Sequence, residues 1–459
     1  MKSFVLAVII ASLPLEIQAQ SGVWSFLENG PDTRDVGNSR HDDVVFIDAN
    51  TGWIANLGGK IYKTSDSGAS WNLQLDAAGT YAFRSISFTG EQIGFAGTLF
   101  TPEDVLLETR DGGQTWINIT TRISGTKPEA LCGLWSVDEN VTVGVGAFFG
   151  APTFIRTSDG GESWTGLDMS PWAAVLIDVY FFDELTGIAL GGTGKNFDGD
   201  AVVLRTTDGG STWRIVHRTN RESGIHGEWG WKLTFPTRDV GYASIEYSTN
   251  DESRPAKVLK TVDGGLTWSE LGIAGSTQRL GLQGIGFVTP DTGWASGRGT
   301  TSVTIDGGQT WTQIADYSPT THTGQLDGKV NRIFTVSDTL AFAVGRRVYR
   351  FSGHVSSTAI QGQTELPRSF RIEQNYPNPF SQQTTIDYEL FRPSDVRIEI
   401  YSLKGRHVRR LFRGFQPSGS YSVLWDGKNE SGQPVSSGNY FYLIDMGDGA
   451  ELKRMVVYR

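Results

Sequence analysis

The sequence predicts an all-β protein, a seven-bladed β-propeller followed by a small Ig-like β-sandwich. Three observations support this fold class. The 459 residues include 57 glycines and 14 tryptophans, a composition typical of many short strands joined by tight turns. A short Asp–Gly–Trp motif recurs six times between residues 65 and 311. Beyond residue 369 the chain changes to short alternating runs with Gly and Pro turns, which indicates a separate β-sandwich.

The first 19 residues have the features of a secretory signal peptide. Lys2 supplies the positive start, and the apolar run that follows is too short to span a bilayer. Ala19 offers a cleavage site. No later stretch is apolar enough to cross a membrane, so we expect no transmembrane segment in the mature chain. We expect it to be secreted or attached to the outer-membrane surface. Cys132 is the single cysteine, which excludes an internal disulfide.

The repeated motif, x-D-x-G-x-[ST]-W, predicts a turn whose chemistry is structural. We expect its Asp to accept hydrogen bonds from backbone N–H groups two or three residues on, and its Gly to supply a positive φ. The Trp begins the next strand and packs a large ring between neighbouring sheets. The residues given this structural role are Asp66, Trp71, Asp111, Trp116, Asp159, Trp164, Asp208, Trp213, Asp263, Trp268, Asp306 and Trp311.

Each motif lies between two strand-like runs, in a unit of about 45 residues. In the sixth copy we predict strands over residues 284–289, 293–296, 301–305 and 311–314. Four short antiparallel strands in a unit of this length are typical of one propeller blade.

The two ends of the repeat region predict how the ring closes. Residues 330–352 repeat the first three strands of a unit, but no motif and no Trp follow them. The missing strand is found at the start of the mature chain, where Val23–Leu27 matches Thr310–Ile314. Trp24 also precedes Trp71 by one repeat length. We therefore predict a propeller over residues 20–353, whose seventh blade is completed by the N-terminal strand.

The motif resembles the Asp box, or BNR repeat, of sialidase-like propellers. Residues 182–188 and 287–294, each followed by a box, are similar to the seven-bladed group that includes photosystem II stability/assembly factor-like proteins. This resemblance covers about residues 22–353 and implies the fold. Because many chemistries use such rings, it does not imply one activity.

Residues 354–368 are polar and predict a linker, and residues 369–459 a second domain. Its motifs are Phe370–Phe380, Ile398–Gly405, Trp425–Gly427, Val435–Tyr442 and Lys453–Arg459. Together they resemble the type A sorting domain of the type IX secretion system of Bacteroidota-like bacteria. The resemblance implies that residues 369–459 engage the secretion machinery, and that the cargo is then released or surface-attached. The alternative is an ordinary Ig-like adhesion module.

The predicted strand order places the boxes on one face of the ring and the longer connections on the other. We expect a ligand face there, since function tends to lie on loops held by a rigid frame. Those connections are residues 98–104, 120–129, 148–152, 193–200, 217–228, 247–256 and 316–329. Aligning the repeats places a set of polar and aromatic residues around the channel mouth on that face: Asp42, Asp43, Arg84, Asp178, Trp231, Lys232, Gln283, Asn331 and Arg332, with Trp135, Glu228 and Trp229 nearby.

These residues leave three hypotheses for function. The first is a non-catalytic propeller that binds an extracellular glycan or protein through Arg84, Trp135, Trp229, Trp231, Lys232, Gln283 and Arg332. The second is a secreted glycoside hydrolase, for which Asp43, Asp178 and Glu228 are the candidate carboxylates. The F/Y-R-I-P motif of sialidases is absent. The third is a structural envelope scaffold. Internal ion pairs in a solvated funnel are an alternative explanation of the charged ring.

Other functions are disfavoured by composition and motif. The net charge of −10 repels phosphate backbones, so we expect no nucleic-acid partner. We expect neither a metal nor a cofactor, because the sequence has no zinc-ligand cluster and no P-loop. Residues 196–200 weakly resemble a calcium loop but lack its distal Glu.

Overall fold

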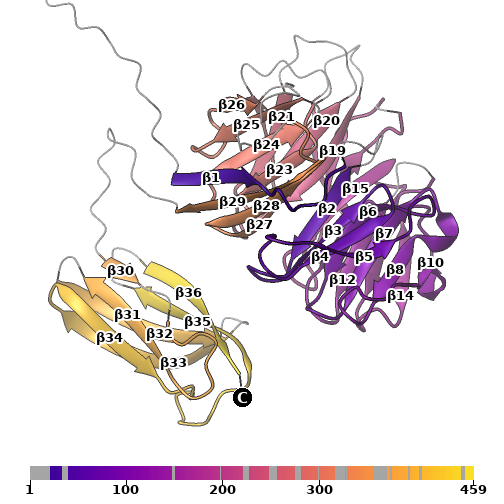
Figure 1. Cartoon of the computed structure of the whole chain (residues 1–459). Coiled ribbons are helices and arrows are strands. Elements are labelled where there is room, and N and C mark those ends of the chain that lie inside the picture. The colour runs from indigo at the N-terminus through magenta and orange to yellow at the C-terminus, as the bar shows by residue number, and fades with distance from the viewer. Residues whose placement is uncertain are drawn as a thin grey trace, which may run out of the picture. The chain divides into compact units, whose positions relative to one another are not determined.

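The computed structural model describes residues 21–33, 40–146, 150–196, 198–220, 227–247, 256–273, 281–297, 299–315, 326, 328–354, 370–372, 375–390, 393–402, 406–445 and 450–458. The chain divides into two compact units, Met1–Ala359 and Ile360–Arg459 (Figure 1). The predicted signal peptide lies outside the described residues, as does almost all of the predicted linker.

The first unit contains seven four-stranded blades in the part that is described. Blades 1 to 3 are formed by β2 (His41–Phe46), β3 (Gly52–Asn56), β4 (Lys60–Thr64) and β5 (Asn72–Asp76); by β6 (Ala82–Phe88), β7 (Gly94–Leu99), β8 (Leu106–Thr109) and β9 (Ile117–Asn118); and by β11 (Gly133–Ser136), β12 (Thr142–Gly146), β13 (Thr153–Thr157) and β14 (Trp164–Asp168).

Blades 4 to 6 follow the same antiparallel order. They are formed by β15 (Val175–Phe181), β16 (Gly187–Gly192), β17 (Ala201–Thr206) and β18 (Arg214–Arg218); by β19 (Glu228–Thr234), β20 (Gly241–Tyr247), β21 (Ala256–Thr261) and β22 (Ser269–Ile273); and by β23 (Gly284–Phe287), β24 (Gly293–Gly297), β25 (Thr300–Thr304) and β26 (Thr312–Ala315).

Blade 7 combines the two ends of the unit. Strands β27 (Arg332–Ser337), β28 (Leu340–Val344) and β29 (Val348–His354) are followed in the sheet by β1 (Ser21–Phe26), which pairs with β29. This is the arrangement that the position of Trp24 predicts. The first strand of every blade contacts the first strand of the next, and β27 contacts β2, so the ring is closed. The all-β fold class predicted from the sequence is confirmed.

The hairpin between the first two strands depends on a glycine that the sequence analysis did not single out. In five blades a Phe at the end of the first strand folds its ring over a Gly six residues later. The pairs are Phe46 and Gly52, Phe88 and Gly94, Phe181 and Gly187, Phe235 and Gly241, and Phe287 and Gly293. A Cβ at any of these glycines would lie 2.2–2.7 Å from ring atoms, so only Gly fits. The rings then pack between blades, and Phe46 stacks on Phe342 of blade 7 at 3.7 Å.

Each Asp box joins the third and fourth strands of its blade, as predicted. In all six boxes the backbone N–H four residues on donates to the Asp, which is one residue beyond the predicted range. In the fifth box the N–H three residues on also donates, from Leu266 to Asp263 at 3.0 Å, as predicted. In the second box, Thr115 donates its backbone N–H to Asp111 Oδ1 at 2.9 Å and its hydroxyl to Oδ2 at 2.6 Å. These bonds lower the pKa of Asp111 to about 2. The expected positive φ occurs at Gly112 and Gly113.

A threonine two residues before each Asp completes the box, and the motif defined from the sequence omits it. Thr109 donates its hydroxyl to Asp111 Oδ1 at 2.9 Å and accepts the Gly113 N–H at 2.8 Å. All six boxes have this buried residue, at Thr64, Thr109, Thr157, Thr206, Thr261 and Thr304. The box tryptophans pack as expected where neighbouring blades meet: Trp164 contacts Phe95 of blade 2, and Trp213 contacts Phe154 of blade 3.

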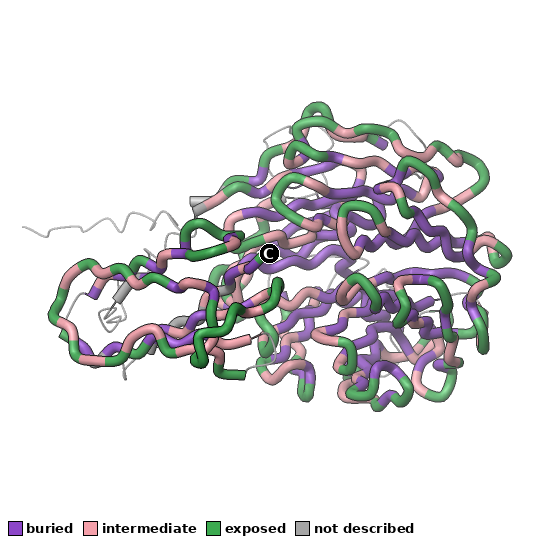
Figure 2. Tube along the Cα trace, turned by 90° about the horizontal axis from the view of Figure 1, so that it is seen from below, coloured by how far each residue is buried: buried purple, intermediate pink, exposed green. Residues whose placement is uncertain are grey.

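Burial follows the strands, and the exposed residues concentrate in the connections (Figure 2). One connection differs from the expectation of a plain loop. Residues 120–129 include a short 3-10 helix (Thr120–Arg122) and β10 (Ile123–Gly125), which adds a parallel fifth strand beside β14. A second 3-10 helix, Pro102–Asp104, lies in the connection of blade 2. Parts of the connections predicted over 148–152, 193–200, 217–228, 247–256 and 316–329 lie outside the described residues.

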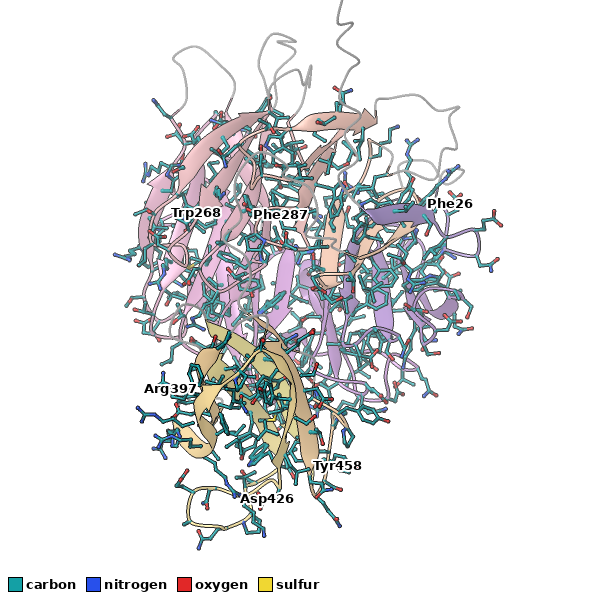
Figure 3. The ribbon with its side chains drawn as sticks, turned by 90° about the vertical axis from the view of Figure 1, so that its left-hand side faces the viewer. Phe26, Trp268, Phe287, Arg397, Asp426 and Tyr458 are labelled. Atoms are coloured by element: carbon teal, nitrogen blue, oxygen red, sulfur yellow. The ribbon has the colours of Figure 1, made fainter. Side chains whose placement is uncertain are left out.

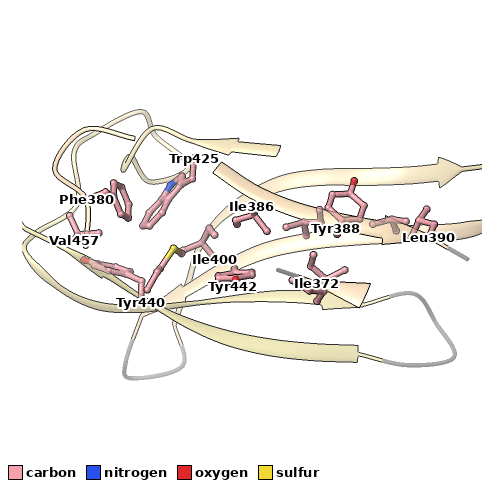
Figure 4. Close-up of a cluster of buried hydrophobic side chains, with 14 residues drawn as sticks. Ile372, Phe380, Ile386, Tyr388, Leu390, Ile400, Trp425, Tyr440, Tyr442 and Val457 are labelled. Carbon is pink, nitrogen blue, oxygen red and sulfur yellow. The ribbon is translucent and has the colours of Figure 1, made fainter. Parts of the chain in front are cut away.

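The second unit is a two-sheet sandwich, in agreement with the Ig-like prediction. One sheet has the order β30 (Phe370–Ile372), β31 (Thr384–Leu390), β34 (Gly419–Trp425). The other has the order β33 (His407–Gln416), β32 (Ser394–Ser402), β35 (Gly438–Asp445), β36 (Ala450–Val457). The core between them includes Trp425, Tyr442 and Ile400 (Figure 4). This unit therefore has an apolar core of its own.

Candidate functional site

The candidate site lies on the first strands of the blades. Five of these seven strands show a register shift against the second strand, and in four of them the shift lies at the candidate site. The register shifts at Asp42 in β2, at Arg84 in β6, at Ile177 in β15, and at Trp231 and Lys232 in β19. A bulge inserts an extra residue and redirects the side chains around it. It therefore explains why adjacent residues, such as Asp42 and Asp43, are both buried in the middle of the ring.

The first group of charges links blades 1 and 2. Arg84 donates to Asp42 at 2.8 Å, and both side chains are fully buried. Arg40, which is 26% exposed, donates to the other oxygen of Asp42 at 2.5 Å and to Gln283 at 3.2 Å. Burial opposes the ionisation of Asp42, but Arg40 and Arg84 outweigh it and lower its pKa. The two arginines therefore favour the ionised form of Asp42.

The second group extends across the ring. Arg332 of blade 7 donates to Asp178 of blade 4 at 2.7 Å, and its Nε lies 3.3 Å from Asp43 of blade 1. Both carboxylates also accept backbone N–H groups from the next blade: Asp43 from Ile86 at 3.0 Å, and Asp178 from Leu233 at 2.8 Å. These two glycosidase candidates are thus brought together, and both are already bonded to the protein.

Their pKa values move in opposite directions. Burial raises the pKa of Asp43, although Arg332 opposes the change. For Asp178 burial acts in the same sense, but Arg332 and Lys232 outweigh it, and the pKa is lowered. Burial lowers the pKa of Lys232. Both aspartates have less than a twentieth of their surface exposed, so neither is presented to solvent.

Four donors in this interior have no hydrogen-bond acceptor. They are Arg84 Nη2, Trp231 Nε1, Lys232 Nζ and Arg332 Nε, and all four residues are buried. The Arg84 guanidinium lies 4.9 Å from the centre of the Trp231 ring, and Lys232 Nζ approaches Asp178 no closer than 3.7 Å. Trp231 packs with Trp229, Val175 and Ile177 in one apolar cluster. A buried donor without an acceptor costs about 1–3 kcal/mol. The arrangement therefore favours a ligand that supplies acceptor oxygens.

The remaining candidates have other roles. Gln283 donates to buried Glu246 at 2.8 Å and thereby joins the first group. Asn331 donates to the His41 carbonyl. Glu228 is separate from Asp43 and Asp178, because it reaches Lys257 of its own blade at 2.9 Å. Trp229 donates to the Gly194 carbonyl at 2.7 Å.

Trp135 does not belong to this set. Its ring packs on Tyr180 at 4.4 Å, and its Nε1 donates to the Phe181 carbonyl. The expectation of a solvated channel mouth also needs correction, because most of the aligned side chains are buried and linked by ion pairs. Internal ion pairs, the alternative explanation of the ring, are observed. Phe100, an exposed aromatic with φ 62° in the connection of blade 2, was not predicted as a candidate.

No cluster of three or more His, Cys, Asp or Glu side chains that could hold a metal ion occurs among the described residues. In the same part of the chain, no helix combines the length and the apolar character needed to cross a bilayer.

The blades, boxes and closed ring define the first unit as an Asp-box β-propeller. Residues 32–150 match the family described as photosynthesis system II assembly factor YCF48. Residues 378–445 match the FlgD Ig-like domain family. The photosystem II assembly lipoprotein Ycf48 of Synechococcus sp. (strain CC9902) is 32% identical over 127 residues, which are 27% of this chain and 35% of the relative. The match thus spans about a third of that relative's length.

Solved structures agree on the fold. YCF48 bound to D1 peptide has a TM-score of 0.51 at 19% identity, over 74% of this chain and 99% of that one. YCF48 from Cyanidioschyzon merolae has the same TM-score at 18% identity, over 73% of this chain and all of that one. An ancestral GH74 enzyme has a TM-score of 0.51 at 15% identity, over 94% of this chain and 63% of that enzyme. The propeller therefore has the Ycf48-like Asp-box fold.

Proposed function

We propose that this chain is an exported, non-catalytic propeller that binds a peptide segment of a protein partner at the centre of its ring. The observation that carries the proposal is the set of unpaired donors on Arg84, Trp231 and Lys232. A peptide offers carbonyl and carboxylate oxygens to such donors. A similar propeller was solved with a bound D1 peptide, which supports a peptide as the ligand class.

The state of the carboxylates disfavours the glycoside hydrolase. Glycosidases need two carboxyl groups free to flank the scissile bond. Asp43 and Asp178 instead share Arg332 and accept backbone N–H groups, and Glu228 is paired with Lys257. Removing any of these bonds would leave a buried charge uncompensated. We therefore assign these carboxylates a structural role inside the ring and not a role in binding or cleaving a substrate.

The export route is part of the proposal. Residues 1–19 have the features of a signal peptide, and residues 369–459 have the motifs of a type A sorting domain. A self-contained sandwich is what a separable sorting unit requires. We propose secretion to the cell surface or medium through the type IX system, with the propeller as cargo. A periplasmic pool in cells that make the full-length chain would contradict this route.

The binding proposal is tested with the purified chain on an array of random decapeptides and on a glycan array. We expect decapeptide binders, and we expect Trp231→Phe to weaken them about fivefold, because it removes one donor and keeps most of the ring. Trp24→Phe is the matched control. Its indole N–H is also buried and unpaired, but it lies in blade 7 among Trp294 and Phe351.

Two results would contradict the proposal. The first is glycan binding that depends on Trp231, with no peptide binding. The second is turnover of an oligosaccharide panel that Asp178→Asn abolishes in a variant that still folds, as judged by circular dichroism.

A further inference from the structure

One aromatic side chain of the propeller is exposed on the face where we expect the ligand. Phe100 follows β7 in the connection to β8, and it is 67% exposed. Among the propeller residues that the structure describes, no other aromatic side chain is exposed. Trp268 and Phe287, labelled in Figure 3, are typical of the rest, because each is buried in a cluster that joins two neighbouring blades. A single exposed apolar residue is ordinary on a protein surface, so exposure alone does not indicate a function.

The backbone at Phe100 is strained as well. Its φ is 62°, and only Ser67 shares a positive φ with it among the non-Gly residues that are described. This conformation is unfavourable for a bulky side chain, whereas Gly adopts it freely. Phe100 gains little burial in return, because two thirds of its surface is exposed. The stability of the fold therefore does not explain why a Phe occupies this position, and strain of this kind is often retained at binding sites.

Hydrogen bonds on both sides hold Phe100 in this conformation. Before it, the hydroxyl of Thr98 donates to the Asp104 carbonyl at 2.7 Å. After it, the backbone N–H of Asp104 donates to the Thr101 carbonyl at 2.8 Å. The Tyr81 hydroxyl donates to the Asp104 carboxylate at 3.2 Å and ties the connection to the start of β6. Because the connection is already ordered, Phe100 can bind a partner at a low cost in conformational entropy.

The strand register places Phe100 at the same end of blade 2 as Arg84. The bulge at Arg84 lies between the residues of β6 that pair with Thr98 and Gly97 of β7. Phe100 is two to three residues further along, which corresponds to about 7–10 Å of strand. An extended decapeptide is up to about 33 Å long. One peptide can therefore extend from Phe100 to the centre of the ring, where Arg84 Nη2 has no acceptor.

We infer that Phe100 binds a large apolar side chain of the peptide partner and so selects among peptides. This inference rests on the proposed function and names the class of peptide. The preferred peptide carries Leu, Ile, Met or an aromatic residue, in addition to the oxygen atoms that the donors at the centre of the ring require. Aromatic residues are frequent hot spots of binding, because they contribute a large contact area and have few rotatable bonds.

The test is binding of the purified full chain to an array of random decapeptides, half of which contain a large apolar residue. We expect these peptides to bind about tenfold more tightly than the others. Phe100→Ala should remove most of this preference and leave the binding of the other peptides within about twofold. The control is Ile117→Ala, which truncates another exposed apolar residue of blade 2 and should leave the preference unchanged.

A second variant separates binding from folding. Phe100→Gly removes the same ring as Phe100→Ala, but Gly adopts φ 62° without strain. We expect its Tm to be about 2 °C higher than that of Phe100→Ala. Both variants should nevertheless bind apolar peptides equally weakly, because both lack the ring. If Phe100 acted through the fold, the more stable Gly variant would recover binding, and this result would overturn the inference.

The remaining outcomes distinguish this inference from the proposed function. Equal peptide preference in Phe100→Ala and Ile117→Ala would overturn the inference and leave the proposed function intact. The absence of any peptide binding would overturn both. Binding on a glycan array that Phe100→Ala abolishes, without a preference for apolar peptides, would identify a sugar as the ligand of Phe100 and would also overturn the inference.

Discussion

Trp24 tests how much of the propeller's stability depends on ring closure. It lies on β1, far from β29 in sequence, yet its ring packs edge-on against Trp294 at 5.2 Å and in a tilted contact against Phe351 at 5.5 Å. The side chain is only 5% exposed. The perturbation is Trp24→Ala, which leaves the backbone pairing of β1 with β29 possible and removes only the ring.

The expected loss follows from the size of the buried side chain. Truncating a buried Trp to Ala costs about 3–5 kcal/mol. Unfolding about 330 residues carries an entropy of about 0.7 kcal/mol per kelvin, so a loss of about 4 kcal/mol lowers Tm by about 6 °C. Deleting residues 21–30 should lower it further, because the whole outer strand of blade 7 is then absent.

Differential scanning calorimetry is the suitable assay, because the second unit has its own core and serves as an internal reference. The control is Val23→Ala, on the same strand, where the side chain is 67% exposed. We expect the control to shift Tm by less than about 1 °C. If Trp24→Ala shifts Tm no more than Val23→Ala does, the argument that β1 locks the ring is refuted.

Three more predictions concern single residues. Ser67 has φ 61° where the other boxes have Gly, and its hydroxyl is buried without a hydrogen-bond partner. Ser67→Gly should therefore stabilise the propeller by about 1 kcal/mol, measured by denaturant titration. A loss of stability in this variant would show that the turn is not strained. Thr109→Val keeps the shape of the side chain but removes its bonds to Asp111 and Gly113, and should cost about 1–3 kcal/mol of stability, with the exposed Thr312→Val as the control. Burial lowers the pKa of His41 from 6.5 to about 4. The stability of the fold with a neutral His41 is therefore fully present above pH 6.5, and it is lost progressively as pH falls toward 4. By pH 5 the loss is about 2 kcal/mol, and His41→Gln should flatten the dependence of Tm on pH over that range.

Much of the fold could be predicted because repetition makes weak patterns strong. Six boxes fixed the number of complete units, and the unpaired Trp24 showed which strand belongs to the seventh. The Thr that precedes each Asp and the Phe–Gly pair of each first hairpin are also visible in the printed sequence. The repeated motif was defined by its turn residues, whereas the Thr and the Phe–Gly pair belong to the strands and hairpin that support the turn.

The site was predicted less well, for a physical reason. Aligning repeats gives a residue's position along a strand but not the direction of its side chain. A bulge at Trp231 and Lys232 changes that direction, and no local pattern marks it. Glu228 thus seemed to join Asp43 and Asp178, although its carboxylate reaches Lys257. The burial of these charged side chains was also not predictable. Charged residues that line a channel are expected to be exposed to water, and the ion-pair partners that allow their burial come from distant blades.

The bond from Arg332 to Asp178 has a consequence for how such a ring can evolve. It joins blade 7 to blade 4, so its length depends on the diameter of the ring and on the number of blades between its ends. Duplicating or losing one blade would separate these buried charges and leave each without a counterion. Neighbouring blades recognise one another mainly through apolar packing, which tolerates exchange. The charges at the centre do not tolerate it, so they commit this sequence to seven blades in this order.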